Sequence, residues 1–277
     1  MIFHNEIITS RNNTTVKWAS SLSEKKGREA SRAFLAEGAK LTFEALDASL
    51  PVSYIFICED RANEYLERIK NYNTGSRFTD TEVFIVCGSA FEKISTEKAP
   101  QGIISVIKYL DFFSRMDIIY KEEFFLKSTE RAIFLSSVRD PGNLGAVIRS
   151  SVAFGVEHII LSSDCADIYN PKTVRSAMGS LFRVKVTSVS DVSSFIISAR
   201  ENGRRVFSSE LKESAISLND LKLSSGDIFV IGNEGHGISR DISEKCTGSV
   251  YIPISKKTES LNASVAAALF MWEQSKL

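Results

Sequence analysis

One short segment of the C-terminal half combines glycines with an asparagine and a carboxylate. It has the sequence GNEGHG at 232–237 and directly follows the apolar run 228–231. Three glycines in six residues let the backbone approach a ligand closely and adopt positive φ angles. The glycine order is not G-x-G-x-x-G, and no lysine followed by serine or threonine comes next, so neither a dinucleotide fingerprint nor a P-loop is indicated. The segment is a candidate ligand loop, with an ordinary glycine-rich turn as the alternative.

A second candidate segment carries a single arginine on an expected helix. The helix is expected over 144–154, with Asn143 as its N-cap and Gly155 as its stop signal. Arg149 lies roughly 130° around this helix from the centre of the apolar stripe, so its side chain points away from the core. Because a helix N-terminus attracts anions, this end of the helix and Arg149 together suit a phosphate. The alternative is that Arg149 is a surface arginine that contacts only solvent.

A third candidate segment opens the last expected helix, over 261–274. Ser260 or Asn262 can cap this helix. The strand expected just before it, over 250–254, contains Pro253, which favours the edge or the end of a sheet. The helix is apolar or small on nearly every side, so we expect its own sheet and a second chain to cover it. A helix inside the core of one chain is the alternative.

These segments belong to one expected α/β unit over 130–277. Its expected strands are 132–136, 158–161, 182–186, 205–208, 228–231 and 250–254, and its expected helices are 144–154, 173–179, 192–201 and 261–274. Strands that alternate with helices predict a mainly parallel sheet, whose ligands bind beyond the carboxyl ends of the strands. A smaller α/β unit is expected over 1–112, with a linker over 113–129. Its apolar runs at 52–58, 83–87 and 102–107 alternate with expected helices at 16–30, 41–50 and 64–72.

The composition excludes several classes of protein. The 277 residues carry 34 Lys and Arg against 34 Asp and Glu, so only local patches of the chain can attract a polyanion. The longest apolar run is shorter than a membrane span and the N-terminus lacks signal-peptide features, so we expect a cytoplasmic protein without membrane contact. The four cysteines and three histidines lack metal-ligand spacing, so we expect no metal. Cys165 is a candidate nucleophile, although such a thiol is more often a small buried group.

Three motifs stand in order along the C-terminal unit: DPxNLGxxxR at 140–149, GNEGxG at 232–237 and SLNxSVA at 260–266. Together they resemble the motifs of the SpoU (TrmH) family of SPOUT RNA methyltransferases. The opening IxSxxN at 8–13 and the segment APQGI at 99–103 also resemble the family's substrate-binding domain, which is similar to a ribosomal RNA-binding protein. The resemblance implies an α/β fold in which a SPOUT domain with a mainly parallel sheet and a deep trefoil knot follows a small RNA-binding domain. It also implies a homodimer, in agreement with the apolar last helix.

The reaction implied by the resemblance transfers the methyl group of S-adenosylmethionine to a ribose 2′-hydroxyl in structured RNA, with ribosomal RNA favoured over transfer RNA. The implied cofactor contacts, mostly through the backbone, are Gly232, Ile252 and Leu261, with Ile231 and Asn233 beside them. The implied catalytic residue is Arg149, oriented together with the ribose by Asn143, Glu234, Ser260 and Asn262. Arg149 is the base proposed for the family. Because a guanidinium keeps its proton, clamping the target phosphate and stabilising the developing alkoxide is the alternative role.

The choice of RNA is assigned to the N-terminal unit. Over 8–32 there are six basic residues against two acidic ones. The candidate RNA-binding residues are Arg11, Lys17, Lys25, Arg28 and Arg32, of which the last three are expected on one helical face. A solvated charged face is the alternative. Because A-form grooves hide the base sequence, a loop or bulge nucleotide is the expected target.

Two other functions compete with methyl transfer. The first is an RNA-binding or ribosome-assembly protein that has the same fold without the activity. The presence of Asn143, Arg149, Glu234 and Asn262 argues against it. The second is a nucleotide-dependent oxidoreductase, which the order of the glycines disfavours.

Overall fold

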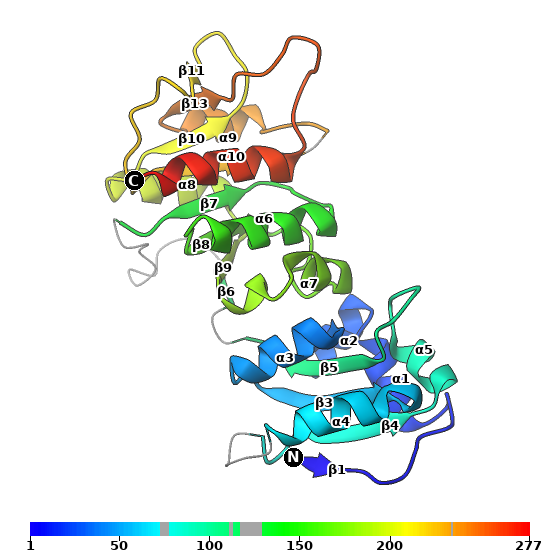
Figure 1. Cartoon of the computed structure of the whole chain (residues 1–277). Helices are drawn as coiled ribbons and strands as arrows, with labels where there is room; N and C mark the ends of the chain where they lie inside the picture. Colours follow the sequence, from blue (N-terminus) through cyan, green and yellow to red (C-terminus); the bar gives the residue numbers. More distant parts are fainter. Residues whose placement is uncertain (73–77, 111–112, 117–128, 234) are drawn as a thin grey trace. The chain divides into compact units, whose positions relative to one another are not determined.

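The computed structural model describes residues 1–72, 78–110, 113–116, 129–233 and 235–277, of which 113–116 are described by their backbone only. Contacts divide the chain into two compact units, whose elements are labelled in Figure 1. Unit 1 contains Met1–Leu110 and Asp167–Phe182, and unit 2 contains Asp111–Ala166 and Arg183–Leu277. No helix in the described ranges is long and apolar enough to cross a membrane.

Unit 1 is built on a five-stranded mixed sheet in the order β1-β4-β3-β5-β2 (Figure 1). Its strands are β1 (Ile2–Phe3), β2 (Ala33–Glu37), β3 (Val52–Cys58), β4 (Glu82–Val86) and β5 (Ile103–Lys108). Its helices are α1 (Thr14–Ser21), α2 (Lys25–Ser31), α3 (Ala39–Asp47), η1 (Glu59–Arg61), α4 (Ala62–Lys70), α5 (Gly88–Ile94), α7 (Pro171–Ala177) and η2 (Ser180–Phe182). Strand β4 runs parallel to β1 and β3, whereas β5 runs antiparallel to β3 and β2.

Both faces of this sheet are buried. Successive residues of a strand point to opposite faces. In β3, Phe56 and Cys58 belong to a hydrophobic cluster with residues of α1 and α5, whereas Ile55 and Ile57 face the other side and are also fully buried. The sheet is therefore covered twice, as in the expected α/β unit.

Two local features of unit 1 differ from the sequence prediction. The helix expected over 16–30 is two helices, α1 and α2, and Arg32 follows them in the left-handed conformation with φ 46°. Strand β2 was not predicted, because a run of only four apolar residues, 33–36, does not distinguish a strand from a helix.

The segment 167–182 falls within the unit expected over 130–277, but its contacts group it with unit 1. Helix α7 packs against β2. The ring of Tyr169 stacks on Phe34 and on Tyr109, at centroid distances of 4.6 Å and 4.2 Å. Arg28 of α2 pairs with Asp167, which lies 139 positions away in the sequence. Contacts over such separations leave no local pattern in the sequence.

Unit 2 is an eight-stranded sheet in the order β11-β13-β10-β12-β7-β8-β9-β6, and every pair of neighbours in it is parallel. The prediction of a mainly parallel sheet is confirmed. The strands are β6 (Phe113–Met116), β7 (Ala132–Leu135), β8 (His158–Ser162), β9 (Lys185–Val189), β10 (Val206–Ser209), β11 (Ile216–Ser217), β12 (Ile228–Ile231) and β13 (Gly248–Tyr251). The helices are α6 (Pro141–Ala153), α8 (Val192–Glu201), α9 (Arg240–Lys245) and α10 (Ala263–Ser275).

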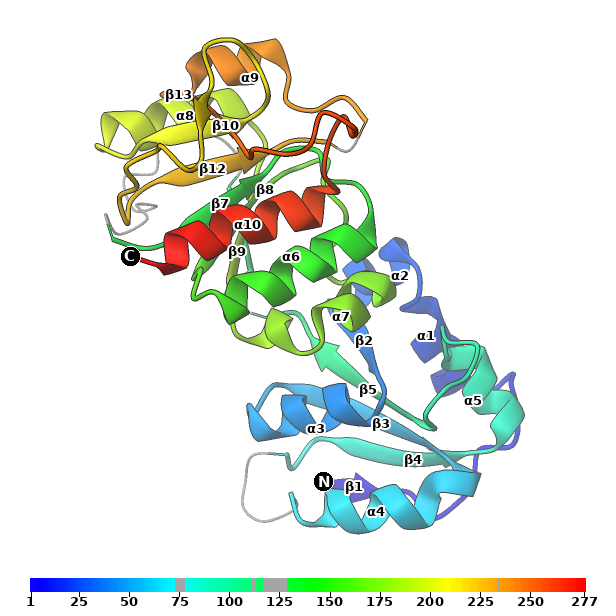
Figure 2. The ribbon, with the colours of Figure 1, turned by 45° about the horizontal axis from the view of Figure 1, so that its top comes forward.

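Two pairs of helices cover this sheet (Figure 2). Helices α6 and α10 lie side by side on one face, where the ring of Phe270 stacks on Phe229 of β12 at 4.5 Å. Helices α8 and α9 contact each other and contribute Ile196 and Ile242 to a cluster with Phe134 and Val230 on the opposite face. The sheet is thus buried on both sides, which explains why its strands are nearly continuous apolar runs.

Three boundaries in unit 2 differ from the expected ones. The strand expected over 182–186 begins at Lys185, because Phe182 belongs to the short helix η2 and the two residues after it form a bend. The strand expected over 250–254 ends at Tyr251, ahead of Pro253, which has no backbone N–H for a sheet. Strand β6 lies within 113–129, where a linker was expected, and it pairs with β9 at the edge of the sheet.

Candidate functional site

A cavity of about 390 Å³ lies at the carboxyl ends of three neighbouring strands of unit 2, β10, β12 and β13. Parallel sheets bind ligands at this edge. Residues from 209–211, 231–237, 250–254 and 259–270 line the cavity. The lining includes residues that the sequence analysis singled out: Ile231, Gly232, Asn233, Ile252, Ser260 and Leu261. The structure thus brings the second and third motifs together around one space.

The glycine-rich loop after β12 is folded back on itself. Asn233 and Gly237 exchange two backbone hydrogen bonds, each of 3.0 Å. A Cβ atom at position 232 would lie 2.4 Å from the carbonyl carbon of Gly237, and Gly237 itself has φ 65°. Glycine is therefore required at Gly232 for space and at Gly237 for its backbone conformation. Glu234, a predicted orienting residue, lies outside the described residues.

The side chain of Asn233 holds this loop in place. Its Oδ1 accepts hydrogen bonds from the backbone N–H groups of Gly235 at 2.9 Å and His236 at 3.2 Å. Its Nδ2 donates to the carbonyl of Ser137, in the loop after β7, at 2.8 Å. The side chain thus organises the loop, in which Gly232 lines the cavity.

The first and third motifs meet at the amino ends of α6 and α10. Asn262 Nδ2 donates to Asn143 Oδ1 at 3.0 Å, and Asn262 Oδ1 caps α10 by accepting from Ser264 N at 2.9 Å. Helix α6 is capped by Asp140, whose Oδ1 accepts from Asn143 N at 2.8 Å. The expected N-cap role of Asn143 is therefore wrong. Pro141 occupies the first position of the helix, where its fixed φ is favourable, and this makes Asp140 the cap.

Arg149 lies on the outer side of α6, exposed to solvent and outside the lining of the cavity. It comes six residues after Asn143, roughly 9 Å further along the helix axis. No hydrogen bond or ion pair joins its side chain to another described residue. The outer side of α10 carries large apolar side chains, of which Val265 is 48% and Trp272 47% exposed. We call the exposed surface of α6 and α10 that contains Arg149, Val265, Leu269 and Trp272 the outer face.

The structure corrects the assignment of Arg28 to the exposed basic residues. Arg28 is only 2% exposed. Its Nη2 lies 2.7 Å from Asp167 Oδ2, and its Nη1 donates to the carbonyls of Leu22 at 3.0 Å and Ser23 at 2.8 Å. A side chain with these partners holds α2 and the segment after β8 together, and it is not available to a polyanion.

The other candidate RNA-binding residues are exposed. Arg11 and Lys17 line a polar hollow of unit 1 together with Lys93 of α5, which the sequence analysis missed. Lys25 has a 65% exposed side chain, and the guanidinium of Arg32 lies 5.5 Å from the centre of the Tyr109 ring. Because Arg32 follows the end of α2, it does not continue the helical face that was expected to present it.

Cys165 is not a reactive thiol, and no metal cluster stands out in the described residues. Burial raises the pKa of Cys165, and its Sγ donates to the carbonyl of Leu135 at 3.3 Å, so this thiol stays protonated. Within the described ranges, no group of three or more His, Cys, Asp and Glu side chains could hold a metal ion.

Comparisons with known proteins agree with this geometry. Residues 130–272 match the SpoU rRNA Methylase family, and residues 13–105 match the MRM3-like substrate binding domain. The Bacillus subtilis (strain 168) protein named 23S rRNA (guanosine(2553)-2′-O)-methyltransferase RlmP is 29% identical, over 96% of this chain and 97% of its own. The Streptomyces viridochromogenes 23S rRNA (uridine(2479)-2′-O)-methyltransferase is 26% identical, over 96% of this chain and 90% of its own.

A solved structure supports the same relationship. The crystal structure of an AdoMet-bound rRNA methyltransferase from Sinorhizobium meliloti superimposes with a TM-score of 0.79 and 25% identity, over 98% of this chain and 97% of that one. The family match extends over more than half of the chain and contains all three motifs. The chain belongs to the SpoU rRNA methylase family.

Proposed function

We propose that the chain transfers the methyl group of S-adenosylmethionine to a ribose 2′-hydroxyl of ribosomal RNA. The observation that carries this proposal is the cavity at the carboxyl ends of β10, β12 and β13, framed by the motifs of the family. The names of the Bacillus and Streptomyces relatives support the 2′-hydroxyl of ribosomal RNA as the acceptor. The AdoMet-bound structure of the Sinorhizobium relative supports the donor.

The residues of the cavity fit S-adenosylmethionine. Its volume of about 390 Å³ lies in the range of sites for small organic ligands. Gly232 and Gly237 expose backbone to the cavity, while Leu261 and Phe270 supply apolar surface for an adenine ring. Its described lining contains Glu210 and Glu259 but no lysine, arginine or histidine, which suits a ligand with a positive sulfonium group. When bound, the cofactor supplies an electrophilic methyl group on sulfur.

We assign the remaining steps to residues of this chain. Ile231, Gly232, Asn233, Ile252 and Leu261 hold the donor, mainly through backbone groups. The hydrogen bond between Asn143 and Asn262 fixes the amino ends of α6 and α10 relative to each other, beside Ser260 at the cavity. The protonated guanidinium of Arg149 clamps the target phosphate and stabilises negative charge as it develops on the ribose oxygen. Glu234 keeps its predicted orienting role.

The outer face is the proposed interface of a homodimer. Val265, Leu269 and Trp272 expose large apolar surfaces there, and large exposed apolar patches favour association. Arg149 lies on the same face and outside the cavity of its own chain. A second copy bound to this face therefore supplies its arginine to the site. A deep trefoil knot in unit 2 and RNA binding by Arg11, Lys17, Lys25 and Arg32 are further parts of this proposal, and a cytoplasmic location stays a prediction.

The function is tested with labelled S-adenosylmethionine and ribosomal RNA that lacks the modification. A 2′-O-methyl group blocks alkaline cleavage of the next phosphodiester bond, so the label is expected in alkali-resistant dinucleotides. R149A is expected to abolish transfer while leaving the affinity for the donor within a few-fold, and R200A, an exposed arginine on the opposite face of the sheet, serves as the matched control. Label in mononucleotides, or turnover by R149A at the normal rate, overturns the proposal. RNA binding without any transfer favours the assembly protein instead.

A further inference from the structure

Glu210 lines the cavity, although none of the three motifs contains it. It directly follows β10, whose neighbours in the sheet, β12 and β13, carry the two other loops of the cavity. Its side chain lines the cavity and is 24% exposed. Among the described residues that line the cavity it is one of two carboxylates, the other being Glu259.

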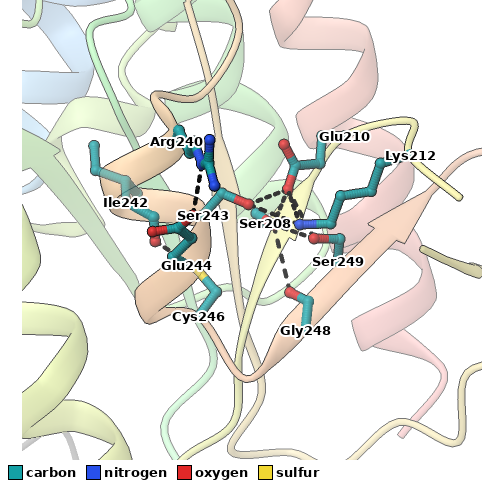
Figure 3. Close-up of polar contacts among 10 residues, drawn as sticks. All are labelled: Ser208, Glu210, Lys212, Arg240, Ile242, Ser243, Glu244, Cys246, Gly248 and Ser249. Atoms are coloured by element: carbon teal, nitrogen blue, oxygen red, sulfur yellow. Dashed lines mark hydrogen bonds and ion pairs between the residues drawn. The ribbon is translucent and has the colours of Figure 1, made fainter. Parts of the chain in front are cut away.

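One oxygen of this carboxylate is saturated with hydrogen bonds (Figure 3). Oε1 accepts from Ser208 Oγ at 2.8 Å, from Ser249 Oγ at 2.7 Å, from Lys212 Nζ at 2.8 Å, and from Ser243 Oγ. These donors come from β10, β13, α9 and the loop after β10, so the carboxylate is fixed from several elements at once. The cluster formed by Ser208, Lys212, Ser243 and Ser249 is named the donor cluster below.

The second oxygen, Oε2, has a different environment. Figure 3 shows it turned away from the donor cluster, and no hydrogen bond joins it to a described residue. Burial alone would raise the pKa of Glu210, but the hydrogen bonds of the donor cluster outweigh it and lower the pKa to about 2. The group is therefore an anion at neutral pH, with one oxygen free to accept a hydrogen bond.

A cationic hydrogen-bond donor is the natural partner of such an oxygen. Lys212 pairs with Oε1 only, and it is not part of the cavity lining, whose described residues include no basic side chain that could pair with Oε2 or Glu259. S-Adenosylmethionine carries two positive groups, a sulfonium and an ammonium. Only the ammonium has N–H bonds, and a hydrogen bond between two charged groups is stronger than one from a neutral ribose hydroxyl. The chemistry therefore favours the ammonium as the partner of Oε2.

We propose that Glu210 Oε2 accepts a hydrogen bond from the ammonium of the methionine portion of S-adenosylmethionine, and that the serines of the donor cluster are positioning residues for this contact. This inference rests on the proposed function, because it takes the cavity as the site of the donor. It adds a cofactor-binding residue from the loop after β10 to the residues of the three motifs.

The test compares three ligands by calorimetry of the full chain. S-Adenosylmethionine and S-adenosylhomocysteine both carry the ammonium, whereas 5′-methylthioadenosine keeps the ribose and adenine but lacks the amino-acid portion. E210Q is expected to lower the affinity for the first two ligands about 10- to 100-fold. The affinity for 5′-methylthioadenosine is expected to stay within about twofold of the wild-type value. Unchanged binding of 5′-methylthioadenosine also shows that the cavity of the variant is folded. E213Q, which removes an exposed carboxylate from the same loop but outside the cavity lining, is the matched control.

Each other result overturns a defined part of the proposal. An equal loss for all three ligands places Glu210 against the ribose or in a purely structural role. A loss confined to S-adenosylmethionine assigns Glu210 to the sulfonium, and unchanged binding of all three removes it from the site. Wild-type protein that binds none of the three ligands refutes the proposed function itself, so the two failures are distinguishable.

The positioning role of the serines is tested separately by the pH dependence of S-adenosylmethionine binding. In wild-type protein the affinity is expected to stay level from pH 7 to pH 5, because the low pKa keeps Glu210 ionised and the α-ammonium of the ligand stays protonated over this range. The charged and titratable groups near it are Lys212 and Cys246, and burial raises the pKa of Cys246 to about 11, so this thiol stays neutral. Replacing Ser243 and Ser249 by alanine removes two donors and raises the pKa of Glu210. The affinity of the double variant is expected to fall as the pH decreases to 5, and a level profile contradicts the positioning role.

Discussion

Replacing Arg28 by alanine is expected to destabilise the protein strongly without touching any exposed basic surface. The wild-type guanidinium makes hydrogen bonds to Asp167 and to the carbonyls of Leu22 and Ser23, and Arg28 is 2% and Asp167 21% exposed at the side chain. Removing one partner of a buried ion pair costs about 3–5 kcal/mol, because the other charge is left unpaired. Such a loss is a large fraction of a typical free energy of unfolding, which is about 5–15 kcal/mol.

Thermal and urea unfolding of the full chain measure this effect. R28A is expected to lower the Tm by about 10 °C or more. K25A, on the same helix with a 65% exposed side chain, is the matched control and is expected to change the free energy of unfolding by no more than about 0.5 kcal/mol. Adding D167N to R28A is expected to restore part of the loss, because no unpaired carboxylate then remains. If R28A unfolds with the wild-type midpoint but binds RNA less tightly, then Arg28 is a surface residue after all and the structural role is wrong.

Three further predictions concern unit 2. In G232A a Cβ would lie 2.4 Å from the backbone of Gly237, so the loop must move. The affinity for S-adenosylmethionine, measured by calorimetry, is expected to fall more than about tenfold. In the control G235A the nearest atom to the new Cβ is 3.5 Å away, so the loss of affinity should be much smaller. W272E places a charge on the outer face and is expected to convert a dimer to a monomer in sedimentation equilibrium, and a wild-type monomer would contradict the proposed interface. Burial lowers the pKa of His158 from 6.5 to about 4. Between about pH 6.5 and pH 4 this histidine is therefore protonated in the unfolded chain but neutral in the folded chain, so the free energy of unfolding decreases as the pH falls through this range. Urea unfolding at pH 7.5 and pH 5 should show this loss in wild type and a smaller one in H158Q, and equal losses would exclude His158 as the cause.

Much of unit 2 could be predicted from the sequence because its signals are local. Buried parallel strands are continuous apolar runs, and Ile228–Ile231 forms β12 with the boundaries expected from its composition. Ligand loops follow such strands, so Gly232 and Leu261 were singled out and now line one cavity. Asn262 caps α10, one of the two caps that the sequence allowed.

The features that could not be predicted depend on contacts between distant positions. An arginine is usually exposed at the protein surface. Arg28 is buried where it pairs with Asp167, which lies 139 positions away in the sequence. Glu210 belongs to no motif, and its partners Ser243 and Ser249 lie 33 and 39 positions further along the chain. Asp140 rather than Asn143 caps α6, a choice between two good capping residues that Pro141 decides.

The most direct test of the proposed donor site is a crystal structure of the full chain with bound S-adenosylhomocysteine. The ligand is expected at the carboxyl ends of β10, β12 and β13, with its adenosine against Gly232, Ile252 and Leu261 and its ammonium at Glu210. Electron density for the ligand at any other place on the chain, with this cavity empty, would contradict the proposed site.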